Sequence, residues 1–313
     1  MEYRKPKIEF YRQRTFTEKM NVTFDFIREN WKPLLKYSFY LIMPVCLVQT
    51  FAINSFFSTY MDLIARTASF TGGFYEPLYR IIGSYGVLFI CITIGMSILS
   101  GLIYEMMQTY AVRENGLMGI TLNDFKDNLI KKIWRCLILS LISIFVTIFV
   151  IVVMAVLAFI STITLILTVP LFLAFIILCV PIMLILPIYL FEENIDIIDT
   201  VKKAWKLGVA TIWGMLGLMI VLYILSSVIN TVTTMPWYIT QFIRMVFSVS
   251  SEFSSTQPVI FNFIVYILGL IQSLGMYISM IIILVGLAFQ YFHAREKVEG
   301  ISIESNISNF DEL

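Results

Sequence analysis

The chain has 313 residues, of which 59% are hydrophobic and 14% are charged, with a formal net charge of +1. Soluble domains are nearer about 45–50% apolar and about 25% charged, so this composition indicates a membrane protein and excludes an ordinary water-soluble domain. The near-neutral charge gives no support for nucleic-acid binding.

The first thirty residues are polar and charged, and the apolar block that follows them is long enough to span a membrane. This pattern predicts a cytoplasmic N-terminal segment with an amphipathic helix, rather than a cleavable signal peptide. A spanning helix needs about 20 mainly apolar residues. The run Cys136 to Phe191 has no Asp, Glu, Lys, Arg or His, so it is expected to hold two spans and a tight turn.

The expected fold is an all-α polytopic membrane protein with six transmembrane helices in three hairpins. We predict a single membrane domain over 1–313, divided into the N-terminal segment 1–33, the six-span bundle 34–292 and a cytoplasmic tail 293–313. The predicted spans are roughly 34–58, 82–110, 136–160, 168–191, 209–232 and 257–292.

The distribution of basic residues predicts the orientation. The termini and the alternate gaps between spans hold 19 Lys and Arg residues on one side of the membrane and 3 on the other. Basic residues accumulate on the cytoplasmic side. Both termini are therefore expected in the cytoplasm.

A loose internal repeat runs through the chain. TEKMNVTFDFIRENWKPLLKY (17–37) and TLNDFKDNLIKKIWRCLILSL (121–141) each run from a polar start to a tryptophan at the membrane edge, and the segment before Trp213 does the same. We predict three copies of one unit, a surface helix followed by a span out and a span back, with the chain entering the membrane at Trp31, Trp134 and Trp213.

The third of these surface helices is predicted over 194–208, with Asn194 as its N-cap. Ile198, Val201 and Trp205 form one apolar stripe at helical spacing. Lysines lie near the negative end of the helix, and such a helix is expected in the headgroup plane, with its stripe in lipid or against the bundle.

Acidic residues end the even-numbered spans, at Glu105, Glu192, Glu193 and Glu296. If the three units pack with pseudo-symmetry, these carboxylates converge at a cytoplasmic mouth that binds a cation or a basic partner. The simpler interpretation is that each is an interfacial charge paired with a nearby Lys or Arg. Glu105 lies deepest in apolar sequence and is the leading single candidate.

His293 is the only histidine, which excludes metal sites built from several imidazoles. No G-x-S-x-G motif accompanies it, and the four cysteines are dispersed without a C-x-x-C pair. We therefore expect no catalytic residue, no cofactor and no metal, and we retain His293 only as an interfacial candidate.

The interior of the predicted bundle is nearly uncharged. Gln49, Asn54 and Gln272 are its strongly polar side chains, while prolines crowd the fourth span at Pro170, Pro181 and Pro187. Prolines in a span kink the helix and free backbone carbonyls, which either shapes the bundle or gates a path.

LPIYLFEENIDIIDTVKKAWKLGVATIWG (186–214) and LAFQYFHAREKVEG (287–300) resemble a group of uncharacterised prokaryotic membrane proteins related to the membrane domain attached to some bacterial glycerophosphodiester phosphodiesterases. The resemblance implies six helices and a location in the cytoplasmic membrane. It implies no catalytic residues, since the phosphodiesterase site belongs to a soluble domain that this chain lacks.

These observations favour a non-enzymatic protein of the bacterial cytoplasmic membrane that organises lipid or assists an assembly. Its expected partners are membrane lipids, together with a protein partner or a second copy of the chain. The alternatives are a transporter or channel with a polar path through Asn54, Gln272 and Glu105, and a membrane-embedded enzyme with clustered catalytic side chains.

Overall fold

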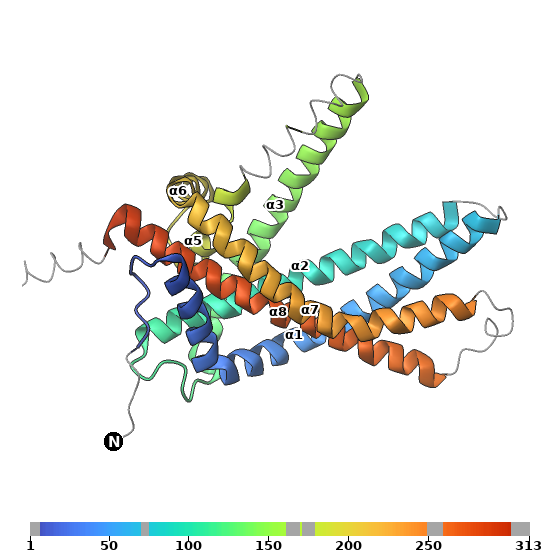
Figure 1. Ribbon diagram of the computed structural model, residues 1–313, viewed down its shortest axis with the longest axis horizontal. Coiled ribbons are helices and arrows are strands. Elements are labelled where there is room, and N and C mark those ends of the chain that lie inside the picture. Colours follow the sequence, from blue (N-terminus) through green and yellow to red (C-terminus); the bar gives the residue numbers. More distant parts are fainter. Residues whose placement is uncertain (1–6, 70–74, 161–169, 171–178, 249–258, 302–313) are drawn as a thin grey trace, which may run out of the picture. The chain divides into compact units, whose positions relative to one another are not determined.

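The structure, a computed structural model, describes residues 7–69, 75–160, 170, 179–248 and 259–301, and every regular element in these ranges is helical (Figure 1). The elements are α1 (Phe16–Ser69), α2 (Tyr75–Val112), the 3₁₀ turn η1 (Leu122–Asp124), α3 (Lys126–Ile160), α5 (Ile185–Phe191), α6 (Ile197–Ala210), α7 (Ile212–Ser248) and α8 (Val259–Glu299).

Within the described ranges, five helices are long and apolar enough to cross a membrane: α1, α2, α3, α7 and α8. This architecture fits an all-α membrane protein. Part of the fourth predicted span, at 168–169 and 171–178, lies outside the described residues. Its described end, Cys179–Phe191, is a shorter apolar helix, interrupted by a turn at residues 183–184 and continued as α5.

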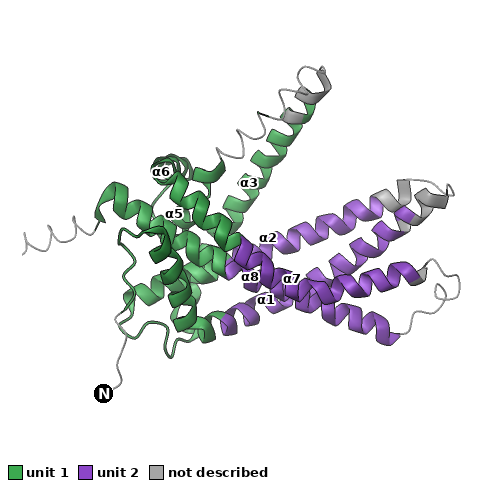
Figure 2. Cartoon of the chain, viewed as in Figure 1, with its two compact units in different colours: residues 1–34, 100–223, 282–313 green, residues 35–99, 224–281 purple. Residues whose placement is uncertain are grey.

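The chain forms two compact units, each assembled from separate stretches of sequence (Figure 2). Unit 1 comprises Met1–Leu34, Ser100–Tyr223 and Ile282–Leu313, and unit 2 comprises Leu35–Leu99 and Ile224–Ile281. Helices α1, α2, α7 and α8 each contribute residues to both units.

The core of unit 1 includes a cluster of aromatic rings. Phe10 packs against Tyr110, Phe289 and Phe292, at ring-centroid distances of 5.9, 5.6 and 4.9 Å. Phe10 belongs to the N-terminal segment 7–15, which precedes α1 and contacts the ends of α2 and α8. The Ile8 backbone N–H donates to the Tyr110 hydroxyl at 3.3 Å. This segment is therefore an integral part of the unit 1 core.

The first predicted surface helix forms, but it is continuous with the span that follows. A capping box starts α1, with the Thr15 backbone N–H donating to Glu18 at 2.7 Å and the Glu18 N–H donating to the Thr15 hydroxyl at 3.4 Å. At Asn30 the backbone leaves helical geometry (φ −112°, ψ 17°), and the Asn30 amide donates to the Phe26 carbonyl at 2.9 Å. This kink separates the polar start of α1 from its apolar part.

The second predicted surface helix does not form a separate element. A capping box at Thr121 and Asp124 starts the turn η1, and α3 then runs unbroken from Lys126 to Ile160. Residues 126–160 contain neither Gly nor Pro, so nothing in the sequence interrupts the helix where it becomes apolar.

The third predicted surface helix forms as the separate helix α6, flanked by the turn after α5 and by Thr211. Its N-cap is Asp196, and the prediction of Asn194 is wrong, because Asn194 lies in a turn two residues earlier. Gly208 allows close packing: a Cβ there would come within 2.5 Å of the Pro181 Cα. Pro181 therefore shapes the contact surface for α6.

The core of unit 2 is apolar and contains uncharged polar pairs. The Tyr277 hydroxyl donates to the Gln49 side chain at 2.6 Å, and the Thr50 and Ser273 hydroxyls lie 3.3 Å apart. Asn54 Oδ1 accepts hydrogen bonds from Trp237 Nε1 at 2.9 Å and from Gln241 Nε2 at 3.1 Å. Two of the three polar residues expected inside the bundle, Gln49 and Asn54, are thus hydrogen-bonded within it.

Candidate functional site

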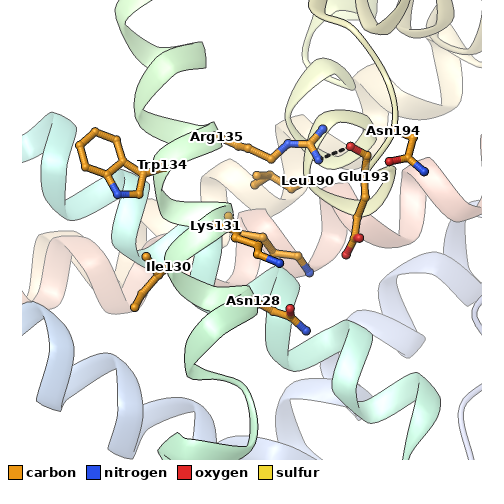
Figure 3. Close-up of a pocket in the computed structure, with 9 residues that line it drawn as sticks. Asn128, Ile130, Lys131, Trp134, Arg135, Leu190, Glu193 and Asn194 are labelled. Atoms are coloured by element: carbon orange, nitrogen blue, oxygen red, sulfur yellow. Dashed lines mark hydrogen bonds between the residues drawn. The ribbon is translucent and has the colours of Figure 1, made fainter.

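Unit 1 contains a pocket of about 450 Å³ between the first turns of α3 and the residues that end and follow α5 (Figure 3). It lies where the charged start of α3 gives way to the uncharged run that begins at Cys136. Its lining residues are Asn128, Ile130, Lys131, Lys132, Trp134 and Arg135 from α3, with Leu190, Glu193 and Asn194 opposite.

Lys132 is the most deeply buried charged group of the pocket. Its Nζ lies 2.6 Å from a carboxylate oxygen of Glu105 on α2, and both side chains are only 4% exposed. Lys132 also donates to the Gln108 side chain and lies 5.8 Å from the centre of the Phe191 ring. The Glu105 carboxylate neutralises this ammonium, so the pair leaves no net charge at the base of the pocket.

Arg135 fixes the opposite wall. Its guanidinium donates to the backbone carbonyls of Glu193 at 2.8 Å and Glu192 at 2.9 Å, and it lies 4.2 Å from the centre of the Tyr189 ring. Both acceptors are neutral carbonyls, and no carboxylate lies within ion-pair distance of Arg135 in the described part of the chain. The guanidinium of Arg135 therefore anchors the turn after α5, and no carboxylate of the described residues neutralises its charge.

Lys131 and Glu193 form the exposed rim of the pocket. Figure 3 shows their side chains at the same opening, with the amides of Asn128 and Asn194 nearby. Across the described ranges, neither Lys131 nor Glu193 makes a side-chain hydrogen bond or an ion pair. The rim thus offers one unpaired cation, one unpaired carboxylate and two amide groups to a ligand.

A second charged cluster of unit 1 links α6 to the end of α8. Lys203 on α6 lies 2.8 Å from Glu192 and 3.1 Å from Glu299. Arg295 bonds Glu299 at 2.8 Å, and the Tyr291 hydroxyl donates to Glu192 at 2.8 Å. The two acids and two bases neutralise one another, so the cluster joins α6 to α8 and leaves no net charge to attract a ligand. We call these four residues, Glu192, Lys203, Arg295 and Glu299, the clasp.

Tyr11 extends this clasp to the N-terminal segment, because Arg295 donates to its hydroxyl at 3.2 Å. Burial raises the pKa of the Tyr11 phenol, while the Arg295 guanidinium acts in the opposite direction. Tyr11 is therefore a neutral hydrogen-bonding group near pH 7.

A buried polar chain joins α1, α8 and the start of α7. Lys19, which is 3% exposed, donates to Gln290 Oε1 at 2.8 Å, and Gln290 Nε2 donates to the Thr211 hydroxyl at 3.1 Å. Nearby, His293 Nδ1 accepts the Arg14 backbone N–H at 3.0 Å. His293 therefore holds the N-terminal segment against α8 through this ring nitrogen.

The predicted acidic candidates occupy different environments within unit 1. Glu105 is paired with Lys132, Glu192 belongs to the clasp, Glu193 lies at the pocket rim, and Glu296 is buried on α8. Lys132 is close to two of these acids: it forms an ion pair with Glu105, and it lines the same pocket as Glu193. The five predicted membrane-surface anchors are all exposed: Trp31, Trp134, Val201, Trp205 and Trp213.

The pocket residues Lys131, Lys132 and Arg135 entered the sequence prediction only through the bias of basic residues that indicates orientation. A usable signal was present, since three bases within five residues flank Trp134 at the start of an uncharged run. Lys19 and Gln290 carried no comparable signal, because their contact joins positions 271 residues apart.

Comparisons of the chain with protein-family models, with curated proteins and with solved structures find no match. Among the described residues, no three His, Cys, Asp or Glu side chains are grouped so as to hold a metal ion.

Proposed function

We propose that the protein is a non-enzymatic component of the bacterial cytoplasmic membrane that organises lipid at the cytoplasmic surface. In this proposal the chain crosses the membrane six times, as three hairpins, with residues 168–191 as the fourth span and both termini in the cytoplasm. The basic-residue bias supports this orientation, and the five long apolar helices support the coarser part of the topology.

The observation that carries the proposal is the exposed apolar stripe of α6. Ile198, Val201, Trp205 and Val209 are all exposed, whereas Thr200, Ala204 and Leu207, on the opposite face, are buried. The buried face already attaches α6 to its own unit, so the exposed stripe is available to lipid. An apolar stripe bordered by lysines is typical of helices that lie in the membrane–water interface.

Two further exposed tryptophans support the same function. Trp31 follows the kink of α1, and Trp213 is the second residue of α7. Indole rings prefer the headgroup region. The neutral, mutually bonded polar residues of unit 2 favour this accessory role over a transport path, because Gln49 and Asn54 are engaged by Tyr277, Trp237 and Gln241.

The test compares the wild-type chain with the double variant Val201→Asp, Trp205→Asp after reconstitution into vesicles at equal protein-to-lipid ratio. The anisotropy of a fluorescent lipid probe reports lipid order. We expect the wild-type protein to raise it and the double variant to lose most of that effect, because two carboxylates prevent the stripe from entering the interface. Val201→Leu, Trp205→Phe is the matched control and should behave as wild type.

Equal anisotropy for the wild type and the Asp variant, at equal incorporation and helicity, would overturn the lipid-organising role. Mass spectrometry of the same vesicles before and after incubation tests the non-enzymatic part. We expect an unchanged lipid composition, and conversion of any lipid would contradict it.

A further inference from the structure

The pocket at the start of α3 has the chemistry of a phosphate-binding site. Its net charge follows from the contacts: Lys132 is neutralised by Glu105, which leaves Lys131 and Arg135 against the single carboxylate of Glu193. The lining therefore carries a net charge of +1, which one phosphodiester neutralises.

The hydrogen-bonding groups match the same ligand. Arg135 has five N–H donors, and two are held by the carbonyls of Glu192 and Glu193, so further donors remain on a guanidinium whose position is fixed. Lys131 adds a freely rotating ammonium, and the Asn128 and Asn194 amides add neutral donors and acceptors. Arginine and lysine are the usual partners of phosphate oxygens in proteins.

An apolar track leads from the pocket along α3. Ile130 and Trp134 line the pocket and are exposed, and Ile138, Leu141 and Phe145 continue the exposed row at intervals of three or four residues. Residues at this spacing lie on one face of a helix. A ligand with a phosphate in the pocket and an acyl chain along this face would contact both parts.

We propose that this pocket binds the phosphodiester of an anionic glycerophospholipid, with Lys131 and Arg135 on the phosphate and an acyl chain along Ile138, Leu141 and Phe145. The inference rests on the proposed function and specifies one lipid class for it. Glu193 disfavours a ligand with more than one negative charge, and its carboxylate accepts hydrogen bonds from headgroup hydroxyls.

The experiment uses the full chain, purified in a neutral detergent and titrated with phosphatidylglycerol, with native mass spectrometry to count bound lipid. We expect one phosphatidylglycerol per chain to be retained in preference to diacylglycerol, which lacks the phosphate, and to phosphatidylcholine, which lacks the net charge. Free glycerol phosphate should not compete at equal concentration, because it lacks the acyl chains. Competition by glycerol phosphate would overturn the assignment to a lipid.

Lys131→Glu tests the site without disturbing the fold, because Lys131 is exposed and unpaired across the described ranges. Its affinity for phosphatidylglycerol should fall roughly tenfold or more, since each basic group near an anionic lipid contributes appreciably. Glu193→Gln should raise the affinity a few-fold by removing a like charge. Lys126→Glu, the same change five residues earlier on α3 and outside the pocket, is the matched control and should bind as wild type.

Unchanged binding by Lys131→Glu, or an equal loss in Lys126→Glu, would overturn the pocket. These outcomes are distinguishable from failure of the proposed function. The pocket is judged by stoichiometric binding in detergent, whereas the surface role is judged by lipid order in vesicles and by the α6 stripe.

Discussion

Units 1 and 2 bury different kinds of polar group. In unit 1 the buried polar groups include full charges paired across helices, as in Glu105 with Lys132. In unit 2 the buried polar groups are amides, hydroxyls and an indole, as in Gln49 with Tyr277 and Asn54 with Trp237. Unit 1 therefore buries charges that neutralise one another, whereas unit 2 buries neutral groups, which cost less to remove from water than an ion does.

Removal of one partner of the buried ion pair should have the largest effect on stability. Lys132→Met leaves the Glu105 carboxylate buried without a counter-charge, and we expect a loss of about 3–5 kcal/mol in the free energy of unfolding. Unfolding by a denaturing detergent, followed by circular dichroism, measures the change. The double variant Glu105→Gln, Lys132→Met should recover most of the loss, and equal stability of the single and double variants would show that the pair is not coupled.

A smaller effect is expected where unit 1 packs without charge. Gly208→Ala places a Cβ within 2.5 Å of the Pro181 backbone, so α6 must move, at a cost of about 1–3 kcal/mol. Gly217→Ala is the control, because its Cβ would meet only the Phe16 ring, at 3.6 Å. Thermal unfolding of both variants provides the measurement, and equal melting temperatures would refute close packing of α6.

Tyr277→Phe examines the neutral hydrogen bonds of unit 2. It removes the donor to Gln49 and should cost about 0.6–1 kcal/mol, as is usual for side-chain hydrogen bonds between membrane helices. Tyr223→Phe, at an exposed position on α7, should leave the melting temperature unchanged. A loss as large as that for Lys132→Met would abolish the distinction between the units.

The smallest effect on folding is expected at the exposed anchors. Trp213→Ala, at a side chain that is 84% exposed, should change the free energy of unfolding by no more than about 0.5 kcal/mol. Trp237→Ala, at a buried indole bonded to Asn54, should cost several times more. Parallel denaturation curves for the two variants decide whether Trp213 serves the surface rather than the core.

The sequence predicted the helical class, because this class depends on composition and on local periodicity. Spacing within one helix also predicted the stripe of Ile198, Val201 and Trp205, but it left open whether the stripe faces lipid or the bundle; all three side chains are exposed. The exact surface-helix pattern was less predictable: η1 and α3 show that a polar start need not form a helix of its own.

The pairings could not be predicted, because they join distant positions. Nothing local marks Lys132 as the partner of Glu105, or Tyr277 as the partner of Gln49 across 228 residues. The pocket likewise forms because the turn after α5 contacts α3. The composition of the uncharged run between these two elements does not predict that contact.

The N-terminal segment has a consequence for biosynthesis. Arg14 donates its backbone N–H to His293, 279 residues later, and Tyr11 accepts from Arg295, 284 residues later. At a synthesis rate of about 5–20 residues per second, these early residues are made roughly 15–60 s before their partners. During that interval Phe10 lacks the rings of α8 that cover it, so the nascent chain exposes an aromatic side chain that the finished protein buries.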